Sequence, residues 1–487
     1  MNVLVIDVGT SSMRALLSGA RGERLLGHQV AYHPTYLPDG RVEQDASSFA
    51  SALCEVVGSV ARNAGEKGHA VDLVTMTSQR SSIVPVDDAD EPLMPFIMWQ
   101  DTRNAALCDE LSKSGVHIFS LSGTRVNTVF SGGKMAWVEL ELPEVASRCR
   151  RYANIPEYLM HLMTGSWHTD PTYASRSNLM NIRTRDWDPE LLGLFGVSRD
   201  KLSDIVECGQ IVGTVSSFFS SATGLAAGTP VVSSGGDQQC AAVGQGVASP
   251  GTVSVVTGTG AFLETAAPSV PDDLTSDVIC NASCLPGQYT LEASVLSCCS
   301  AFDWFRTTFC PDMDYARIGR ELEVQHARGT SCVVLPYFQG RGTPDWNAQA
   351  TATLHGIRLS ATREELLYAL LVGIFTEVRN NLDSMERYVP LVRGSVSGGL
   401  TQTPVINQIQ ADVYGFPLSR LDDFGSTARG ALLVALLSQG AYGTAEEAYG
   451  ALSGDATAEA YEPDPARHGE FLDLQRRSQD LYARLYA

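Results

Sequence analysis

The stretch VVSSGGDQQCAAVGQGVASPGTVSVVTGTGAF, residues 231–262, decides how the rest of this chain is organised. A β-branched run breaks at a glycine pair, and Asp237 follows at the start of a predicted helix, residues 238–243. Asp is a preferred helix N-cap residue, so one interpretation of Asp237 is purely structural. A second β-branched run, residues 252–257, ends at Gly258-Thr259-Gly260. Such a turn closes ordinary hairpins, but its bare N–H groups also suit an anion.

Composition excludes several classes of function. The 487 residues carry 35 basic and 55 acidic side chains, a net charge of -20, and contain no basic run that could follow a nucleic-acid backbone. The N-terminus lacks a basic leader, and no apolar run is long enough to cross a bilayer. We therefore expect a cytoplasmic protein of two or three domains, with neither nucleic acid nor membrane as a partner.

The eleven cysteines do not form a metal-binding pattern. Cys280 and Cys284 lie close together, but no second pair or neighbouring histidine completes a zinc site. Reduced, packed thiols are the expected state.

The N-terminus predicts a second turn of the same kind. Residues 3–6 form a short apolar strand that ends at Asp7. The turn that follows is rich in small and hydroxyl residues, namely Gly9, Thr10, Ser11 and Ser12. Its N–H groups can form a concave nest for phosphate oxygens, Asp7 can hold Mg²⁺ through water, and Arg14 can add a cation. The alternative is a plain hairpin in which Asp7 is a turn residue.

An arginine between two strand-like runs is the next unusual feature. Arg80 separates residues 73–78 from residues 83–86, and a buried cation needs a partner. Either Arg80 pairs with a carboxylate such as Asp101, or it faces a cleft and binds hydroxyl groups. Trp99 lies beside polar residues and suits one wall of a sugar pocket.

The second half repeats the strand-turn-strand pattern of the first, over residues 252–266. The repeat indicates two related domains, with a boundary between residues 246 and 250 that divides the chain into 1–247 and 248–487. Further on, a predicted core helix covers residues 364–388. Gly398-Gly399 then leads through Thr403 into another helix, which is a plausible nucleotide cradle because glycine permits close backbone approach.

Several motifs in order resemble the FGGY family of carbohydrate kinases, which includes kinases of glycerol and of xylulose. The resemblance extends from residue 3 to about residue 440. The segments that carry it are DVGTSSMRALL, EQDA, SQRSSIVPVDD, MPFIMWQDTR, FSGGKMAWV, EYLMHLMTGSWHTDPTYASRSNLMNI, GGDQQCAAVGQG, TGTGAF, LEASVLSCCSAFDWF and GGLTQTPVINQIQADVYG.

This resemblance implies an α/β fold of two actin-like, ribonuclease H-like domains around a central cleft for nucleotide and sugar. It implies ATP and Mg²⁺ as cofactors, and transfer of the γ-phosphate to a hydroxyl group with Asp237 as the general base. Asp7 and Asp237 would face the metal. Sugar contacts would come from Arg80, Ser81, Trp99, Asp237, Gln238 and Phe262. Nucleotide contacts would come from Gly9, Thr10, Ser11, Ser12, Arg14, Gly258, Thr259, Gly260, Gly398, Gly399 and Thr403.

The substrate is predicted from two departures from the family pattern. Ser81 stands where glycerol-specific members have a glutamate, and Val129 stands where they have a substrate-contacting tyrosine. The Met-His pair that xylulose-specific members usually carry near Arg80 is also absent. Smaller side chains leave room for a longer substrate, so a pentulose such as xylulose is the first candidate.

Other assignments stay open at this point. One is a kinase of glycerol or another sugar alcohol, and a different class is an actin-like ATPase module that acts on a protein partner. A nicotinamide-dependent oxidoreductase is disfavoured because no Gly-x-Gly-x-x-Gly follows the first strand. The sequence is compatible with a homodimer and does not determine the oligomeric state.

Overall fold

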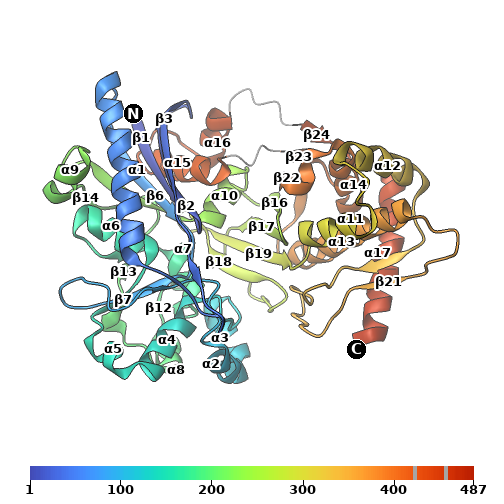
Figure 1. Cartoon of the computed structure of the whole chain (residues 1–487), viewed down its shortest axis with the longest axis horizontal. Coiled ribbons are helices and arrows are strands. Elements are labelled where there is room, and N and C mark those ends of the chain that lie inside the picture. Colours follow the sequence, from blue (N-terminus) through green and yellow to red (C-terminus); the bar gives the residue numbers. More distant parts are fainter. Residues whose placement is uncertain (421–424, 454–458, 487) are drawn as a thin grey trace.

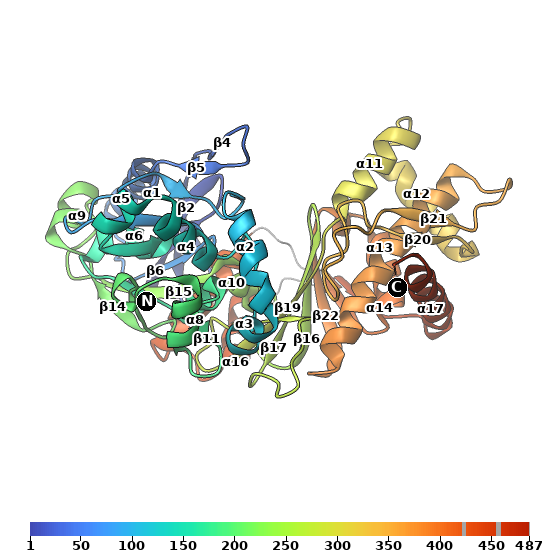
Figure 2. The same cartoon turned by 90° about the horizontal axis from the view of Figure 1, so that it is seen from below.

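The computed structural model describes residues 1–420, 425–453 and 459–486. Two α/β domains lie side by side, one built on a six-stranded sheet and the other on a seven-stranded sheet (Figure 1, Figure 2). The two-domain α/β organisation expected from the repeated pattern is therefore present. In the described parts of the chain, no helix is long and apolar enough to cross a membrane.

The N-terminal sheet begins as an antiparallel meander of three strands and continues with two parallel strands. Its strands are, in spatial order, β14 (Ile211–Thr214), β15 (Pro230–Gly236), β6 (Leu73–Ser78), β1 (Asn2–Val8), β2 (Ser12–Gly19) and β3 (Arg24–Ala31). β1 is antiparallel to β2 and parallel to β6, which in turn is parallel to β15. Because these three strands are parallel, the carboxyl ends of β1, β6 and β15 lie at the same edge of the sheet.

The C-terminal sheet repeats this topology. Its strands are β18 (Ile279–Ala282), β19 (Tyr289–Val295), β17 (Ala261–Ala267), β16 (Gly251–Thr257), β22 (Leu391–Gly398), β23 (Leu418–Arg420) and β24 (Glu459–Tyr461). β19, β17 and β16 form the antiparallel part, and β16, β22 and β23 run parallel. The order β19-β17-β16-β22-β23 thus corresponds to the order β3-β2-β1-β6-β15.

A smaller, five-stranded sheet lies beside the N-terminal sheet and positions Arg80. Its strands are β4 (Thr35–Tyr36), β5 (Val42–Gln44), β8 (Phe96–Ile97), β7 (Ile83–Val86) and β9 (Arg151–Asn154). The chain leaves the six-stranded sheet at the end of β6 and enters the smaller sheet at β7. Residues 79–82 therefore connect two buried sheets, which holds their backbone in place.

The predicted helices are present, with different ends. The first helix is α1 (Ala46–Lys67), which ends at Gly68 because that residue adopts φ 72° and donates its N–H to the carbonyls of Ala64 and Gly65. The core helix expected over residues 364–388 is α13 (Arg363–Glu386), most of which is buried. All eleven cysteines are free, and Cys280 and Cys284 are buried.

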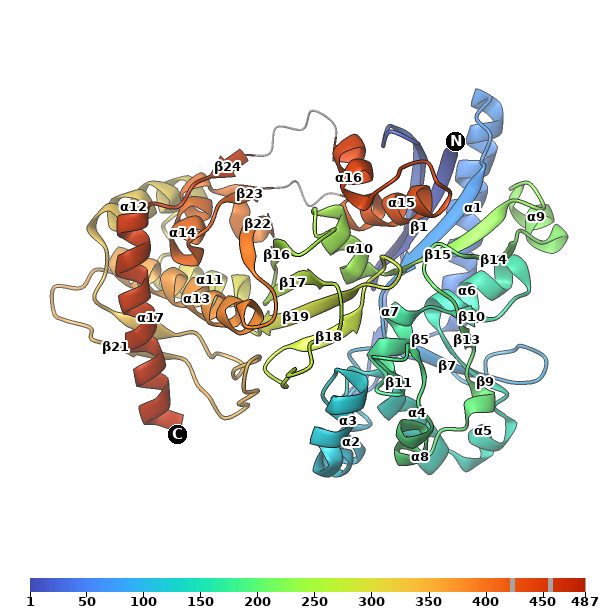
Figure 3. The same cartoon turned by 180° about the vertical axis from the view of Figure 1, so that it is seen from behind.

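Two late helices return to the N-terminal domain. α15 (Ser426–Ser438) lies beside β1 and α10 (Asp237–Gly244), and α16 (Ala445–Ser453) packs on α15 (Figure 1, Figure 3). Leu432 and Leu436 of α15 share a buried cluster with Val3 and Val232 of the N-terminal sheet. α17 (Pro465–Tyr486) then packs on the C-terminal domain against α13 and α14 (Pro404–Tyr414). The division at residues 247 and 248 stays a prediction about the folding units.

Candidate active site

Asp237 lies where the parallel strand β15 ends and α10 begins. The N-cap of α10 is Gly236 and not Asp237, so the predicted cap role is wrong. Asp237 is instead the first helical residue, and its Oδ1 accepts the N–H of Gln238 at 2.8 Å. Because the backbone N–H groups at a helix start are unpaired, a negative charge is stabilised there.

Arg80 is held beside Asp237. Its Nε lies 3.6 Å from Asp237 Oδ1, and its Nη1 lies 3.5 Å from Glu292 Oε2. Nη1 also donates to Gln239 Oε1 at 3.2 Å. Asp101, the other expected partner, binds Arg103 at 2.8 Å. Of the two interpretations made from the sequence, the structure supports pairing with a carboxylate, but the partners are Asp237 and Glu292 rather than Asp101.

Ser81 follows Arg80 with an unusual backbone. It adopts φ 71°, in the left-handed region that residues with a side chain seldom occupy, and it is buried. Its Oγ donates to the carbonyl of Arg176 at 3.4 Å. Strained residues of this kind concentrate at functional sites, and here the strain fixes the direction in which Arg80 leaves the chain.

Three charged residues of the site were not predicted from the sequence: Arg176, Glu264 and Glu292. Arg176 Nη1 lies 3.1 Å from Glu292 Oε2, so this carboxylate is shared by two arginines. Glu264 on β17 lies directly opposite Glu292 on β19. Each glutamate interrupts an otherwise uncharged strand, AFLETAA and YTLEASV, and that interruption is the signal that could have revealed them.

Burial shifts the acidity of this cluster. Burial raises the pKa of Asp237 to about 6, although Arg80 opposes the rise. Burial and the neighbouring Glu292 raise the pKa of Glu264 to about 8. For Glu292, burial favours a higher pKa, but Arg176 and Arg80 outweigh it and the pKa is lowered. Near neutral pH the cluster therefore contains two guanidinium groups, two carboxylates and one protonated carboxyl.

The turn between β1 and β2 lies near this cluster. The N–H of Gly9 donates to the carbonyl of Ser12 at 2.9 Å, which closes the turn. Tyr32 Oη and Gln79 Nε2 both donate to the carbonyl of Gly9, at 2.7 and 3.0 Å. The indole N–H of Trp99 donates to Thr10 Oγ1 at 3.1 Å. Side chains outside the turn therefore hold its backbone in place. One of them is Trp99, the residue predicted to form a wall of the sugar pocket.

Asp7 precedes this turn and pairs across the strands with Arg14. Arg14 Nη2 lies 2.7 Å from Asp7 Oδ2, and Arg14 Nε donates to the same oxygen at 2.9 Å. Burial raises the pKa of Asp7 although Arg14 opposes the rise. The electrostatic influence of Asp7 in turn raises the pKa of Asp237, so the two carboxylates lie within reach of each other's field. Asp7 Oδ1 is the oxygen that Arg14 leaves free.

The turn at Gly258-Thr259-Gly260 joins β16 to β17 in the other domain. The N–H groups of Cys298 and Cys299, at the start of α11 (Cys299–Phe309), donate to the carbonyls of Thr259 and Gly258 at 2.8 and 2.9 Å. The turn carbonyls are therefore engaged on the protein side. A Cβ added to Gly258 would meet nothing closer than 3.8 Å, so this turn faces open space.

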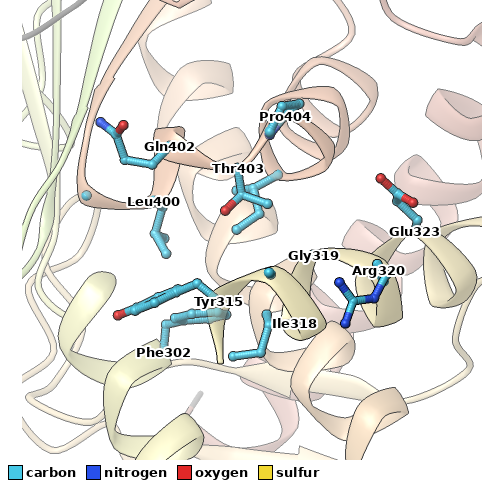
Figure 4. A pocket seen from close by; sticks show the side chains of 13 residues that line it. Phe302, Tyr315, Ile318, Gly319, Arg320, Glu323, Leu400, Gln402, Thr403 and Pro404 are labelled. Atoms are coloured by element: carbon cyan, nitrogen blue, oxygen red, sulfur yellow. The ribbon is translucent and has the colours of Figure 1, made fainter. Parts of the chain in front are cut away.

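A pocket of about 570 Å³ lies beside the glycine pair at the end of β22 (Figure 4). One side is α12 (Tyr315–Arg328), where Tyr315, Ile318 and Gly319 face the cavity, and the other side is Leu400, Gln402 and Thr403. Its size suits a nucleoside. The sequence predicted the Gly399–Thr403 side, but the α12 side was missed because nothing in an amphipathic surface helix marks it as a pocket wall.

The remaining predicted sugar contacts, Trp99, Phe262 and Gln238, are partly exposed. The Trp99 side chain is 36% exposed and the Phe262 side chain is 44% exposed, which is high for large apolar residues. Gln238 is half-buried next to Asp237. Within the described residues, no group of three or more His, Cys, Asp or Glu side chains could hold a metal by itself. A cation here would depend on phosphate oxygens and on one or two carboxylates, the arrangement usual for Mg²⁺.

Comparison with known proteins decides the family. The N-terminal domain of the FGGY family of carbohydrate kinases matches residues 2–244, and the C-terminal domain of that family matches residues 253–438. The chain belongs to the FGGY family. It is therefore an ATP-dependent phosphotransferase that acts on a carbohydrate, as the motifs predicted.

Relatives and solved structures agree with this assignment. A glycerol kinase from Trichlorobacter lovleyi is 32% identical over 457 residues, and glycerol kinase 1 from Pseudomonas aeruginosa is 28% identical over 453; each alignment covers 90% of both chains. The ligand-bound xylulose kinase of Lactobacillus acidophilus superposes with a TM-score of 0.91 at 19% identity, covering 100% of this chain and 98% of that one. Glycerol kinase of Plasmodium falciparum with ADP gives 0.89 at 23% identity, covering 98% and 97%. The predicted actin-like fold is confirmed.

Proposed function

We propose that this FGGY kinase transfers the γ-phosphoryl group of ATP to a hydroxyl of a small ketose or sugar alcohol, with Asp237 as the general base. The observation that carries the proposal is the pair of Asp237 and Arg80, with Nε to Oδ1 at 3.6 Å, beside Glu292 of the other domain. A carboxylate whose pKa is raised to about 6 is ionised at neutral pH and is still a better proton acceptor than an ordinary aspartate.

The transfer can be derived from the residues of this site. Asp237 accepts the proton of the sugar hydroxyl as the hydroxyl oxygen attacks the γ-phosphorus, and the bond to the β,γ-bridging oxygen breaks as ADP leaves. Arg80 holds Asp237 and lies beside the hydroxyl groups of the acceptor. The turns at Gly9 and at Gly258 supply N–H donors to the phosphates from opposite domains, so closure of the cleft would complete the site and exclude water.

We further propose that Mg²⁺ accompanies ATP. The free Oδ1 of Asp7 fits a contact through water, and Asp237 would provide a second carboxylate. When bound, the ion would neutralise the charge of the β- and γ-phosphates.

For the acceptor, we propose a substrate longer than glycerol, with a pentulose such as xylulose as the first candidate. Ser81, the first departure from the glycerol-specific pattern, is buried. At Val129, the second departure, Lys134 Nζ donates a hydrogen bond to the backbone carbonyl at 2.9 Å, which holds the loop in place with a small side chain. Neither residue provides the hydrogen bonds that the family's glutamate and tyrosine would make with glycerol. Glycerol is the second candidate, because relatives 28–32% identical are glycerol kinases.

A panel of acceptors tests the proposal through ADP release. Glycerol, erythritol, xylitol, D-xylulose and D-ribulose would be compared by kcat/KM at saturating ATP and Mg²⁺. We expect the five-carbon substrates to exceed glycerol by about tenfold or more, since each lost polar contact of a substrate costs about this factor. A preference for glycerol would overturn the longer-substrate proposal. ATP turnover stimulated only by a protein would restore the ATPase alternative, which family membership disfavours.

A further inference from the structure

Glu264 is a buried carboxyl group with an oxygen that no described residue hydrogen-bonds. The residue is 5% exposed, and its Oε2 has no partner among the residues that the structure describes. Buried polar atoms are nearly always paired, and an unpaired one costs free energy unless a ligand or water completes it. The carboxyl of Glu264 therefore requires an explanation.

The position of Glu264 directs it toward the other domain. Side chains two residues apart on a strand share a face, so Glu264 lies on the same face of β17 as the exposed Phe262. Its cross-strand neighbour on that face is Glu292, which binds Arg80 and Arg176 of the N-terminal domain. Glu264 thus belongs to the wall that the C-terminal domain presents to Asp237 and Arg80.

The neighbours of Glu264 are already engaged elsewhere. Glu292 receives hydrogen bonds from Arg176 at 3.1 Å, from Asn281 at 2.9 Å and from Arg80 at 3.5 Å. Arg80 also faces Asp237. The two arginines therefore have carboxylate partners other than Glu264.

The protonation state of Glu264 adds to this geometry. The charged groups that face it are Arg80, Arg176, Asp237 and Glu292. With its pKa raised to about 8, the carboxyl is protonated at neutral pH and can donate one hydrogen bond and accept another. A sugar hydroxyl has the same two capacities, whereas a cation or an anion would use only one of them.

We propose that Glu264 is a specificity-determining residue that binds a substrate hydroxyl beyond the carbon that is phosphorylated. Arg80 spans the distance from Asp237 at one end to Glu292 at the other. A substrate whose reacting hydroxyl lies at Asp237 and whose chain follows Arg80 toward Glu292 would bring a hydroxyl farther along that chain to Glu264, the cross-strand neighbour of Glu292. This inference rests on the proposed function and specifies how the longer substrate is recognised.

Two substitutions at Glu264 and one control test the inference. E264L removes both hydrogen-bonding capacities, whereas E264Q keeps a donor and an acceptor in a group of the same shape. T265V is the control, because Thr265 is the next residue of β17, faces the opposite side and bonds to the carbonyl of Thr252. Each variant would be assayed with the best five-carbon substrate and with glycerol, and binding of the sugar without ATP would be measured by calorimetry.

We expect E264L to raise KM and the dissociation constant for the five-carbon substrate by about tenfold or more, and those for glycerol by less than about threefold. E264Q should stay within about threefold of wild type for both substrates, and T265V should not change the preference. An equal loss of kcat on both substrates in E264L and E264Q would show that Glu264 only positions Arg80 and Arg176. Unchanged constants in E264L would also overturn the inference.

Two further measurements distinguish failure of the Glu264 inference from failure of the proposed function. If wild-type enzyme prefers glycerol, the longer-substrate proposal fails before any variant is made. If E264L does not fold, wild type and E264Q can be compared at about pH 7 and about pH 9, because only the wild-type side chain ionises between them. Affinity for the five-carbon substrate should then fall in wild type relative to E264Q, and a constant ratio would overturn the inference.

Discussion

The two large sheets share one topology but differ at the residues that flank their first turns. In the N-terminal sheet, the pair two residues before and after the hairpin turn is Asp7 and Arg14. In the C-terminal sheet, the pair at the corresponding place is Val256 and Phe262. The same backbone thus carries an ion pair at this place in one domain and two apolar side chains in the other.

The parallel strands that follow show the same divergence. β6 pairs with β1 through Ser78, and Arg80 follows two residues later; β22 pairs with β16 through Gly398, and Leu400 follows two residues later. The N-terminal strand end carries a cation toward Asp237, whereas the C-terminal strand end opens into the pocket under α12. We infer that the two sheets arose by duplication. Side-chain changes then gave the N-terminal strand end its role in proton transfer and the C-terminal strand end its role in nucleotide binding.

The largest expected effect comes from Asp237. D237N should lower kcat by about 10³-fold or more while ADP binding stays within a few-fold, because the amide cannot accept the hydroxyl proton. Turnover can be measured by ADP release, and binding by calorimetry. Near wild-type turnover in D237N would show that the N-terminal strand end does not provide the base.

Gly398 tests the backbone of the C-terminal strand end. A Cβ at this residue would lie 2.0 Å from the carbonyl oxygen of Thr257, at φ +98°. G398A should therefore lower the free energy of unfolding by about 2 kcal/mol or more, measured by thermal or denaturant melts. G258A is the matched control in the neighbouring turn, where the new methyl group meets nothing within 3.8 Å, and its melt should resemble that of wild type. Equal melts for G398A and wild type would contradict the close approach of β22 to β16.

The pH dependence of kcat/KM tests the charged groups at the N-terminal strand end, because the corresponding C-terminal strand end carries none. The base must be ionised, so kcat/KM should fall about tenfold per pH unit below the Asp237 pKa of about 6 and level off above it. Arg80 lowers this pKa, so R80Q should move the acid limb to higher pH. An acid limb near pH 4 in wild type would mean that Asp237 is not buried in the active enzyme, or that it is not the base.

The smallest effect is expected at the nucleotide pocket. Y315A removes an aromatic wall and should raise KM for ATP by about fivefold, with KM for the sugar unchanged, since one aromatic contact contributes about 1 kcal/mol. F218A is a suitable control, because Phe218 is 85% exposed on α9 (Ser217–Thr223), which Figure 1 shows at the far end of the N-terminal domain. If Y315A changed KM for the sugar instead, the inference that the C-terminal strand end binds the nucleotide and the N-terminal one serves the sugar would be wrong.

Much of the site was predictable because its parts are local. Turns after short strands place Asp7 and Gly9 in one hairpin and Gly258 in another, and a strand followed by a helix places Asp237. Each of these depends on a few consecutive residues. Arg176, Glu264 and Glu292 were missed because they are far apart in the sequence: Glu264 and Glu292 become neighbours when β17 pairs with β19, and Arg176 reaches Glu292 from the other domain.

By itself, the sequence determined the family and the reaction, because these depend on short motifs. It also determined the duplicated α/β scaffold, because that depends on hydrophobic periodicity. Only the tertiary structure decided that Arg80 pairs with Asp237 rather than Asp101, and that Gly236 rather than Asp237 caps α10. It also revealed that α12 forms a wall of the pocket beside Gly399 and that Glu264 Oε2 is buried with no hydrogen-bond partner among the residues that the structure describes. Burial and pairing are properties of the packed chain, because the acidity of a carboxyl group depends on whether neighbouring segments remove water from it or place an arginine beside it.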